Sequence, residues 1–180
     1  MATTRKKVNW NGFTVCNCKT MEGTDGYVLS CDLKLNGKKV AHCFDGGYGG
    51  EMEISTEKGI SYKKLSEAVK GFKEDRVDPE DGFVHEFDLE SMIYQMMDAE
   101  ELSKDITKAR AKGYFVAVIE RKHYLPTVSY NVPFQWSDEL AKTKLLQMKG
   151  AEEFRDMTFY RNVEQLDINN KEVRFEDIAC

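Results

Sequence analysis

The segment from residue 26 to residue 50 constrains the fold more than any other part of the chain. Two runs in which apolar and polar residues alternate, 27–35 and 38–44, flank a single Asn36-Gly37 pair. Asn and Gly tolerate the positive φ that both central residues of a type I′ turn require, so the pair predicts a two-residue hairpin turn. Such a turn fixes the strand register and therefore predicts which residues face one another.

Counting outward from this turn places Cys31 opposite His42 and puts Cys43 on the other face of the sheet. Cys31 and His42 are then a possible thiolate–imidazole pair, although a reduced cysteine beside a core histidine is the alternative. A zinc site using both Cys31 and Cys43 would need ligands on two sides of one sheet, which tetrahedral coordination does not allow. The predicted apolar face consists of Leu29, Cys31, Leu33, Val40, His42 and Phe44.

The rest of the chain alternates between strand and helix patterns. In chain order the predicted elements are strands at 13–19, 27–35, 38–44 and 51–55, helices at 61–73 and 88–113, strands at 114–122 and 128–134, a helix at 137–149, and short strands at 158–166 and 172–178. Residues 98–101 could split the second helix. We expect an α+β fold, an antiparallel β-meander followed by helices and a second β-hairpin region, in a single domain over 1–180, with 1–11 as a loose basic arm.

Composition fits a folded protein of the cytoplasm. Hydrophobic residues make up 41% of the 180 residues and charged residues 32%. The longest apolar run, 114–119, is far shorter than the ~20 residues that span a bilayer. The first ten residues lack the apolar segment of a secretory signal, and the five cysteines are an odd number. We expect a cytoplasmic protein with no membrane partner and reduced cysteines.

Acidic residues are concentrated between positions 74 and 90, within a chain of net charge -5. This balance argues against the DNA or RNA backbone as a direct partner. The segment is either a solvated loop leading into a helix or a surface that meets a basic groove on another protein. Its acidic members are Glu74, Asp75, Asp78, Glu80, Asp81, Glu86, Asp88 and Glu90.

The glycine-rich stretch 45–50 is a second candidate site. Its backbone could form a nest for phosphate, but it leads into the acidic Glu51 and Glu53 rather than into a helix. A wide, bulged loop is the alternative, with Tyr48 at its tip as a contact residue for a partner. His85 lies among acidic residues and could bind a metal, but no catalytic or metal motif of known spacing occurs. We therefore expect no cofactor and no enzymatic activity.

The second half of the chain is rich in aromatic residues interleaved with arginines and lysines. Together with Arg5, Lys6 and Lys7 of the basic arm, they could bind single-stranded nucleic acid. Their strand-like periodicity and the acidic balance of the chain favour core filling instead.

The hairpin carries a resemblance. The segment Gly26-Tyr-x-Leu-x-Cys-Asp-Leu-x-x-Asn-Gly-Lys-Lys-Val-Ala, followed by Asp45-Gly-Gly-Tyr-Gly-Gly, resembles the N-terminal hairpin of small proteins encoded by phages and mobile elements. Some of these similar proteins are anti-defence factors, including anti-CRISPR inhibitors of type II CRISPR nucleases. The resemblance implies a non-enzymatic accessory protein in a bacterial host, and it assigns no residue a role.

These observations lead to one main hypothesis and two alternatives. The main hypothesis is a macromolecular binding protein that inhibits a host defence nuclease, or its nucleoprotein complex, through an acidic surface that occupies a basic nucleic-acid channel. The alternatives are a nucleotide-binding protein or small enzyme that uses the glycine loop with Cys31 and His42, and a single-stranded nucleic-acid binder. The residues expected to contact the partner are Asp75, Asp78, Glu80, Asp81, Glu86 and Tyr48.

Overall fold

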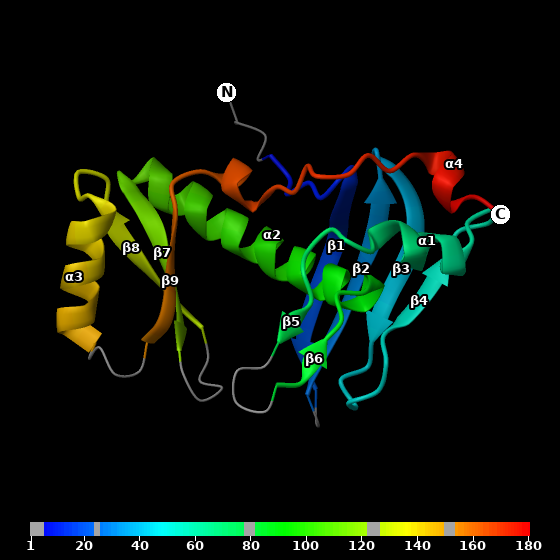
Figure 1. Cartoon of the computed structure of the whole chain (residues 1–180), viewed down its shortest axis with the longest axis horizontal. Helices are drawn as coiled ribbons and strands as arrows, with labels where there is room; N and C mark the ends of the chain where they lie inside the picture. The colour runs from blue at the N-terminus through cyan, green and yellow to red at the C-terminus, as the bar shows by residue number, and fades with distance from the viewer. Residues whose placement is uncertain (1–5, 24–25, 78–81, 122–126, 150–153) are drawn as a thin grey trace. The chain divides into compact units, whose positions relative to one another are not determined.

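A computed structural model describes residues 6–23, 26–77, 82–121, 127–149 and 154–180 (Figure 1). The fold is α+β, as predicted. It forms two compact units, which we describe separately: the meander unit, residues 7–100 with 167–180, and the three-stranded unit, residues 101–166 with Lys6. The single-domain expectation stays a prediction.

The meander unit is built on four antiparallel strands in sequential order. They are β1 (Phe13–Glu22), β2 (Tyr27–Leu35), β3 (Lys38–Asp45) and β4 (Glu53–Thr56). The predicted turn is confirmed, because Asn36 and Gly37 have φ values of 49° and 84°. Both central residues therefore adopt the left-handed conformation that a type I′ turn needs.

The predicted register holds for the two residue pairs next to the turn, beginning with Leu35 and Lys38, and is wrong beyond them. Lys34 faces Lys39 as expected, but Leu33 faces Ala41 rather than Val40. Val40 is the extra residue of a β-bulge, in which two residues of one strand oppose a single residue of its neighbour. Val40 and Ala41 are both apolar and both fully buried, and the bulge allows two successive side chains to reach the core.

The bulge moves every later residue of β3 to the opposite face, as a one-residue shift must. Cys31 faces Cys43, and both thiols are buried. His42 faces Asp32 on the exposed side, and the Phe44 side chain is also exposed. The predicted apolar face that included His42 and Phe44, and the predicted Cys31–His42 pair, are therefore wrong.

Helices α1 (Tyr62–Val69) and α2 (Leu89–Ala111) each start within one residue of the predicted position. The Ser61 hydroxyl accepts the amide of Lys64, and the Asp88 carboxylate accepts the amide of Ser91 at 2.8 Å. Helix α1 ends earlier than predicted, since Gly71 has a φ of 79° and breaks the helical path. Residues 98–101 stay helical and do not divide α2. None of the described helices combines the length and apolar character needed to cross a membrane.

The core of the meander unit lies between one face of the sheet and these helices (Figure 1). The Phe13 ring of β1 lies 6.0 Å from the ring of Phe72, which follows α1. Many core residues lie at positions that the sequence pattern predicts. Alternation along a strand and spacing of three to four residues along a helix each place apolar side chains on one face of the element. The buried residues include Phe13, Val15, Cys31, Leu33, Leu35, Val40, Cys43, Leu65, Val69, Phe72, Leu89, Met92, Ile93 and Met96.

A two-stranded hairpin that was not predicted joins α1 to α2. Its strands β5 (Arg76–Val77) and β6 (Val84–His85) pair Arg76 with His85 and Val77 with Val84. Two-residue strands are too short to show an alternating pattern in the sequence. The hairpin falls inside the acidic segment 74–90 and decides which side chains that segment presents to solvent.

The described part of the predicted basic arm is not loose. Val8 and Trp10 are buried, and Trp10 bridges to Ile168 of the C-terminal segment. Asn11 is buried, and its side-chain Oδ1 accepts hydrogen bonds from the backbone amides of Asn170 and Lys171, both at 2.9 Å. These bonds hold the beginning and the end of the meander unit together.

The predicted strand at 172–178 is also wrong. The chain forms a short helix here, α4 (Phe175–Ile178). The Asp177 carboxylate within it accepts a hydrogen bond from the backbone amide of Arg174, the residue before the helix, at 2.8 Å. This local hydrogen bond closes a helical turn and competes with an extended backbone.

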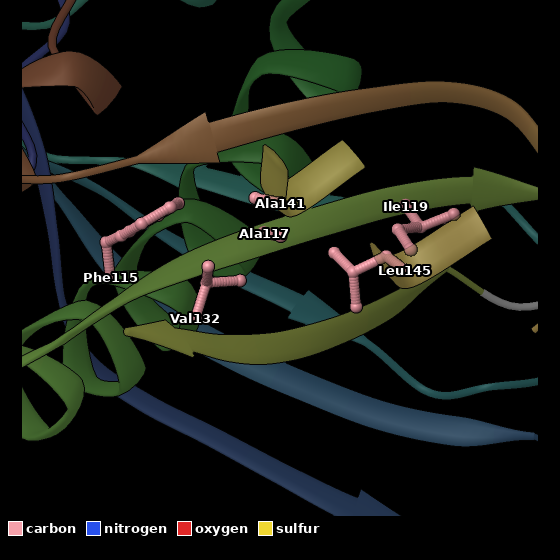
Figure 2. Packing of buried hydrophobic residues seen from close by; sticks show 6 residues of the cluster. All are labelled: Phe115, Ala117, Ile119, Val132, Ala141 and Leu145. Atoms are coloured by element: carbon pink, nitrogen blue, oxygen red, sulfur yellow. The ribbon is translucent and has the colours of Figure 1, made fainter. Parts of the chain in front are cut away.

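The three-stranded unit consists of β7 (Tyr114–Arg121) between β8 (Val128–Pro133) and β9 (Phe154–Tyr160), with α3 (Asp138–Lys149). Strand β9 begins earlier than the predicted 158–166, and the end of that range is a 3₁₀ turn, η2 (Val163–Leu166). Figure 2 shows the core of the three-stranded unit. Tyr130, Trp136 and Phe159 pack against this core, so these aromatic residues fill it as predicted. The clustered side chains are Phe115, Ala117, Ile119, Val132, Ala141 and Leu145.

Candidate functional site

The acidic segment of the meander unit divides into carboxylates that hold the backbone and carboxylates that face solvent. Asp75 belongs to the first kind, because its Oδ1 accepts the amide of Phe87 at 2.8 Å. Asp88 likewise caps α2. The Glu86 side chain is exposed. Of the predicted contact residues, Asp78, Glu80 and Asp81 lie outside the described part of the chain.

A cavity of about 780 Å³ opens between α1 and the β5–β6 hairpin. Its walls carry both signs of charge. The ammonium groups of Lys70 and Lys73 share the lining with four carboxylates, and Lys73 donates to Gln95 at 2.6 Å while lying 4.3 Å from the centre of the Trp10 ring. Burial of this ammonium lowers the pKa of Lys73. The lining residues are Ser66, Lys70, Gly71, Phe72, Lys73, Glu74, Asp75, Glu86, Phe87, Asp88 and Asn170.

A second depression of about 440 Å³ lies between strand β6 and the start of α2. We call it the hairpin groove. Aromatic rings and carboxylates line it, and its described lining includes no lysine or arginine. The side chains are Phe83, Val84, His85, Glu86, Asp88, Glu90, Ser91 and Tyr94. Glu86 and Asp88 also border the larger cavity, so the two depressions are adjacent.

The hairpin groove is bordered by apolar side chains that face solvent. Phe83 is 60% exposed and Val84 is 49% exposed, and Val77 beside Val84 in the ladder is 56% exposed. The ring centre of Phe83 lies 4.8 Å from that of His85 in an edge-to-face arrangement. Contiguous exposed apolar side chains with a polar rim are typical of interaction surfaces.

The glycine loop is held by its first residue. The Asp45 carboxylate accepts the amide of Gly47 at 2.7 Å and the hydroxyl of Tyr94. The Tyr94 hydroxyl and the Gly47 amide both lower the pKa of Asp45, whereas burial and the Asp45 charge raise the pKa of Tyr94. Tyr48, next in the loop, is 81% exposed. The side chain of Tyr48 is therefore accessible on the loop, and its role as a contact residue stays a prediction.

Close backbone packing explains the glycines of this loop. A side chain at Gly26 would meet the carbonyl oxygen of Gly47 at 2.7 Å, and one at Gly47 would meet the carbonyl oxygen of Tyr27 at 2.9 Å. Gly47 also has a φ of 74°, which favours glycine. The glycines thus serve to seat the loop on the β1–β2 end of the sheet.

Tyr94 links the two parts of the candidate site. Its ring lines the hairpin groove, and its hydroxyl holds the glycine loop through Asp45. Tyr94 of α2 therefore lies beside both predicted contact residues: it lines the same groove as Glu86, and it holds the loop that carries Tyr48. Phe83, Val84, Glu90 and Tyr94 were not predicted as site residues.

On the exposed face of the sheet, His42 is part of a polar cluster and not a partner of a cysteine. The Asp32 carboxylate accepts hydrogen bonds from His42 Nδ1 and Lys39 Nζ, both at 2.9 Å, and from Asn17 Nδ2 at 2.7 Å. The hydrogen bond from His42, followed by those from Asn17 and Lys39, holds the pKa of Asp32 far below its usual range. The predicted pairing of Cys31 with His42 is therefore wrong, because His42 bonds to Asp32 on the opposite face of the sheet from Cys31.

Three thiols form a row across strands β1, β2 and β3. Cys31 faces Cys43, and the bulge between Cys16 and Lys19 brings Cys18 within hydrogen-bonding distance of Cys31. The Cys18 contact lowers the pKa of Cys31, but the Cys43 contact and burial outweigh it and raise that pKa to about 12. The Cys31 contact and burial also raise the pKa of Cys18. High pKa values keep thiols protonated and weakly nucleophilic.

The described residues offer no cluster of three or more histidine, cysteine, aspartate or glutamate side chains suited to a metal ion. His85, the sequence-based candidate, packs its ring against Phe83 instead.

Comparison with known proteins gives no family assignment, since no protein-family model, curated protein or solved structure matches the chain. One signal for the residues missed by sequence reasoning was present: Phe83-Val84 is an apolar pair within an otherwise acidic segment.

Proposed function

We propose that this protein is a non-enzymatic binding protein that inhibits a bacterial defence nuclease by occupying a basic, nucleic-acid-binding surface of that nuclease. The observation that carries the proposal is the combination of exposed apolar side chains and carboxylates around the hairpin groove. Phe83 and Val84 supply apolar contact area, and Glu86 and Glu90 supply negative charge. The choice of partner is supported by the resemblance of the hairpin to small proteins of phages and mobile elements, some of which are anti-defence factors.

Charge and shape have separate roles in this proposal. A nuclease groove that holds nucleic acid is lined with basic side chains, so an acidic surface is steered toward it and competes with the nucleic acid. Long-range attraction mainly increases the association rate, whereas desolvated aromatic contacts slow dissociation. Tyr48 on the glycine loop and Phe83 on the hairpin are suited to that second role, because both rings are largely exposed.

The test is complex formation with a guide-loaded type II CRISPR nuclease. We expect reversal of Asp78, Glu80, Asp81 and Glu86 to lysine to weaken binding at least about tenfold and to restore DNA cleavage. The matched control reverses Glu57, Glu139, Glu164 and Glu176, four exposed carboxylates outside the acidic segment. Equal loss of binding in both variants would reduce the effect to net charge and contradict the surface assignment. No binding by the unmodified protein would contradict this choice of nuclease.

A further inference from the structure

We infer that the hairpin groove accepts an arginine side chain of the partner protein, an inference that rests on the proposed function and names the chemistry of its contact. The groove lies entirely within the meander unit, between β6 and the first two turns of α2. Its volume of about 440 Å³ is ample for one long side chain.

The ring of Phe83 gives the groove a face that a cation can stack on. It is 60% exposed, and the edge-to-face contact with His85, at 4.8 Å between centres, fixes its orientation. A guanidinium above an aromatic face gains cation–π attraction of about 0.5–1 kcal/mol at exposed sites. Because the guanidinium is planar and weakly hydrated, it stacks on a ring better than an ammonium does.

Glu86 and Glu90 give the groove its charge complementarity. They lie at opposite ends of a five-residue stretch, one just after β6 and the other in the first turn of α2. Asp88 between them is engaged as the N-cap of α2, where its charge offsets the positive end of the helix. Glu86 and Glu90 are thus the two carboxylates of the groove that do not cap α2, and they can receive the fork of guanidinium donors, although the charge of Glu86 also acts on Lys70 of the adjacent cavity.

The identity of the lining favours arginine over other occupants. Phosphate or nucleic acid would meet three carboxylates and no described lysine or arginine in the groove. A purely apolar side chain would bury carboxylates without a partner, which is costly. An arginine supplies apolar contact through its methylene groups, ring stacking through its guanidinium plane and hydrogen bonds to carboxylates.

Tyr94 prepares the groove for this occupant. Its hydroxyl is already bonded to Asp45, so the ring is held as a wall and its polar end is satisfied elsewhere. A preformed wall reduces the entropy lost on binding. This contact also connects occupancy of the groove to the position of the glycine loop and Tyr48.

The experiment is an amide-resolved NMR titration of the full chain with the peptide acetyl-Gly-Arg-Gly-Arg-Gly-amide. We expect shift changes centred on residues 83–94, about threefold or more weaker affinity for the lysine peptide, and loss of binding for the peptide with neutral citrulline. Phe83→Ala and Glu86→Gln should each weaken binding about threefold or more, whereas the control Glu176→Gln on α4 should leave it unchanged. Phe83 and Glu86 are exposed, so both variants should keep the fold.

In the peptide titration, the inference is overturned by no binding of the arginine peptide, by equal affinity for the citrulline peptide, or by shift changes spread evenly over all acidic segments. The outcome is separable from that of the proposed function, because the peptide assay contains no nuclease. Peptide binding in the groove with no nuclease binding would refute the proposed function alone. Nuclease binding that is unaffected by Phe83→Ala and Glu86→Gln would refute the arginine contact alone.

Discussion

Tyr94 donates a hydrogen bond from its hydroxyl to the carboxylate of Asp45 and so joins the second turn of α2 to the end of β3. This contact organises the candidate site, because Tyr94 also forms a wall of the hairpin groove. We expect Tyr94→Phe to lower the free energy of unfolding by about 1 kcal/mol, the usual value for one hydrogen bond. Urea denaturation checks this, with the exposed Tyr62→Phe as the control.

The same contact makes a prediction about pH. The folded-state pKa of Asp45 is lowered, so its contribution to stability is fully present above the unfolded value of about 3.9 and is lost as the pH falls through the folded value. The stability difference between the unmodified protein and Tyr94→Phe should therefore shrink below about pH 4. A difference that stays constant down to pH 2 would show that the hydrogen bond does not depend on the Asp45 charge.

Asp32 should carry a larger acid dependence. Its three partners hold its folded pKa far below the unfolded value, so its contribution is complete above about pH 4 and fades only in strong acid. We expect Asp32→Asn to lower the free energy of unfolding at pH 7 by about 2 kcal/mol and to flatten its acid dependence. Glu51→Gln, in the exposed loop, is the control. An unchanged pH profile in Asp32→Asn would exclude this cluster as a source of stability.

Asn11 is expected to be among the most sensitive polar residues of the meander unit. It is buried, accepts the amides of Asn170 and Lys171, and has a φ of 53°. Asn11→Ala should lower the free energy of unfolding by about 2 kcal/mol, since it removes two part-buried hydrogen bonds to the amides of Asn170 and Lys171 and strains the backbone. Asn11→Gly removes the same hydrogen bonds but tolerates this φ, so it should cost less. Equal thermal denaturation curves for both variants would assign the whole effect to the hydrogen bonds.

The thiols should differ in reactivity in a way that exposure alone does not predict. Cys18 and Cys180 are both exposed, but contact with Cys31 raises the pKa of Cys18. At neutral pH, iodoacetamide should therefore label Cys180 faster than Cys18, and the buried Cys31 and Cys43 slowest of all. Mass spectrometry of digested protein gives the order. In Cys31→Ala the labelling of Cys18 should accelerate, and no acceleration would disprove the contact.

Local signals in the sequence predicted the large elements well. The Asn36-Gly37 turn, the four-stranded meander and the starts of helices α1 and α2 follow from residue preferences over a few positions. The register beyond the turn did not follow, because the bulge at Val40 depends on how the whole sheet packs on its helices. A single extra residue was enough to exchange the surroundings of His42 and Cys43.

The candidate site was predicted only in part. Tyr48 and Glu86 are exposed as expected, whereas Asp75 holds the backbone of Phe87. The hairpin groove was missed because two-residue strands leave no periodic pattern, and because the contact between Asp45 and Tyr94 joins positions 49 residues apart. Such a contact depends on tertiary packing, which no local window of sequence contains.

The backbone at the start of the meander unit contacts both points at which the chain leaves and re-enters this unit. The amide of Val8 donates to Glu100 and the next amide, that of Asn9, donates to Asp167, both at 2.8 Å. Residues 101–166 therefore leave and rejoin the meander unit at neighbouring points, in the manner of a module inserted into a host fold. Because α2 runs unbroken from Leu89 to Ala111, one helix belongs to both units, and a change of length in residues 101–166 would reach the meander unit first at Glu100 and Asp167.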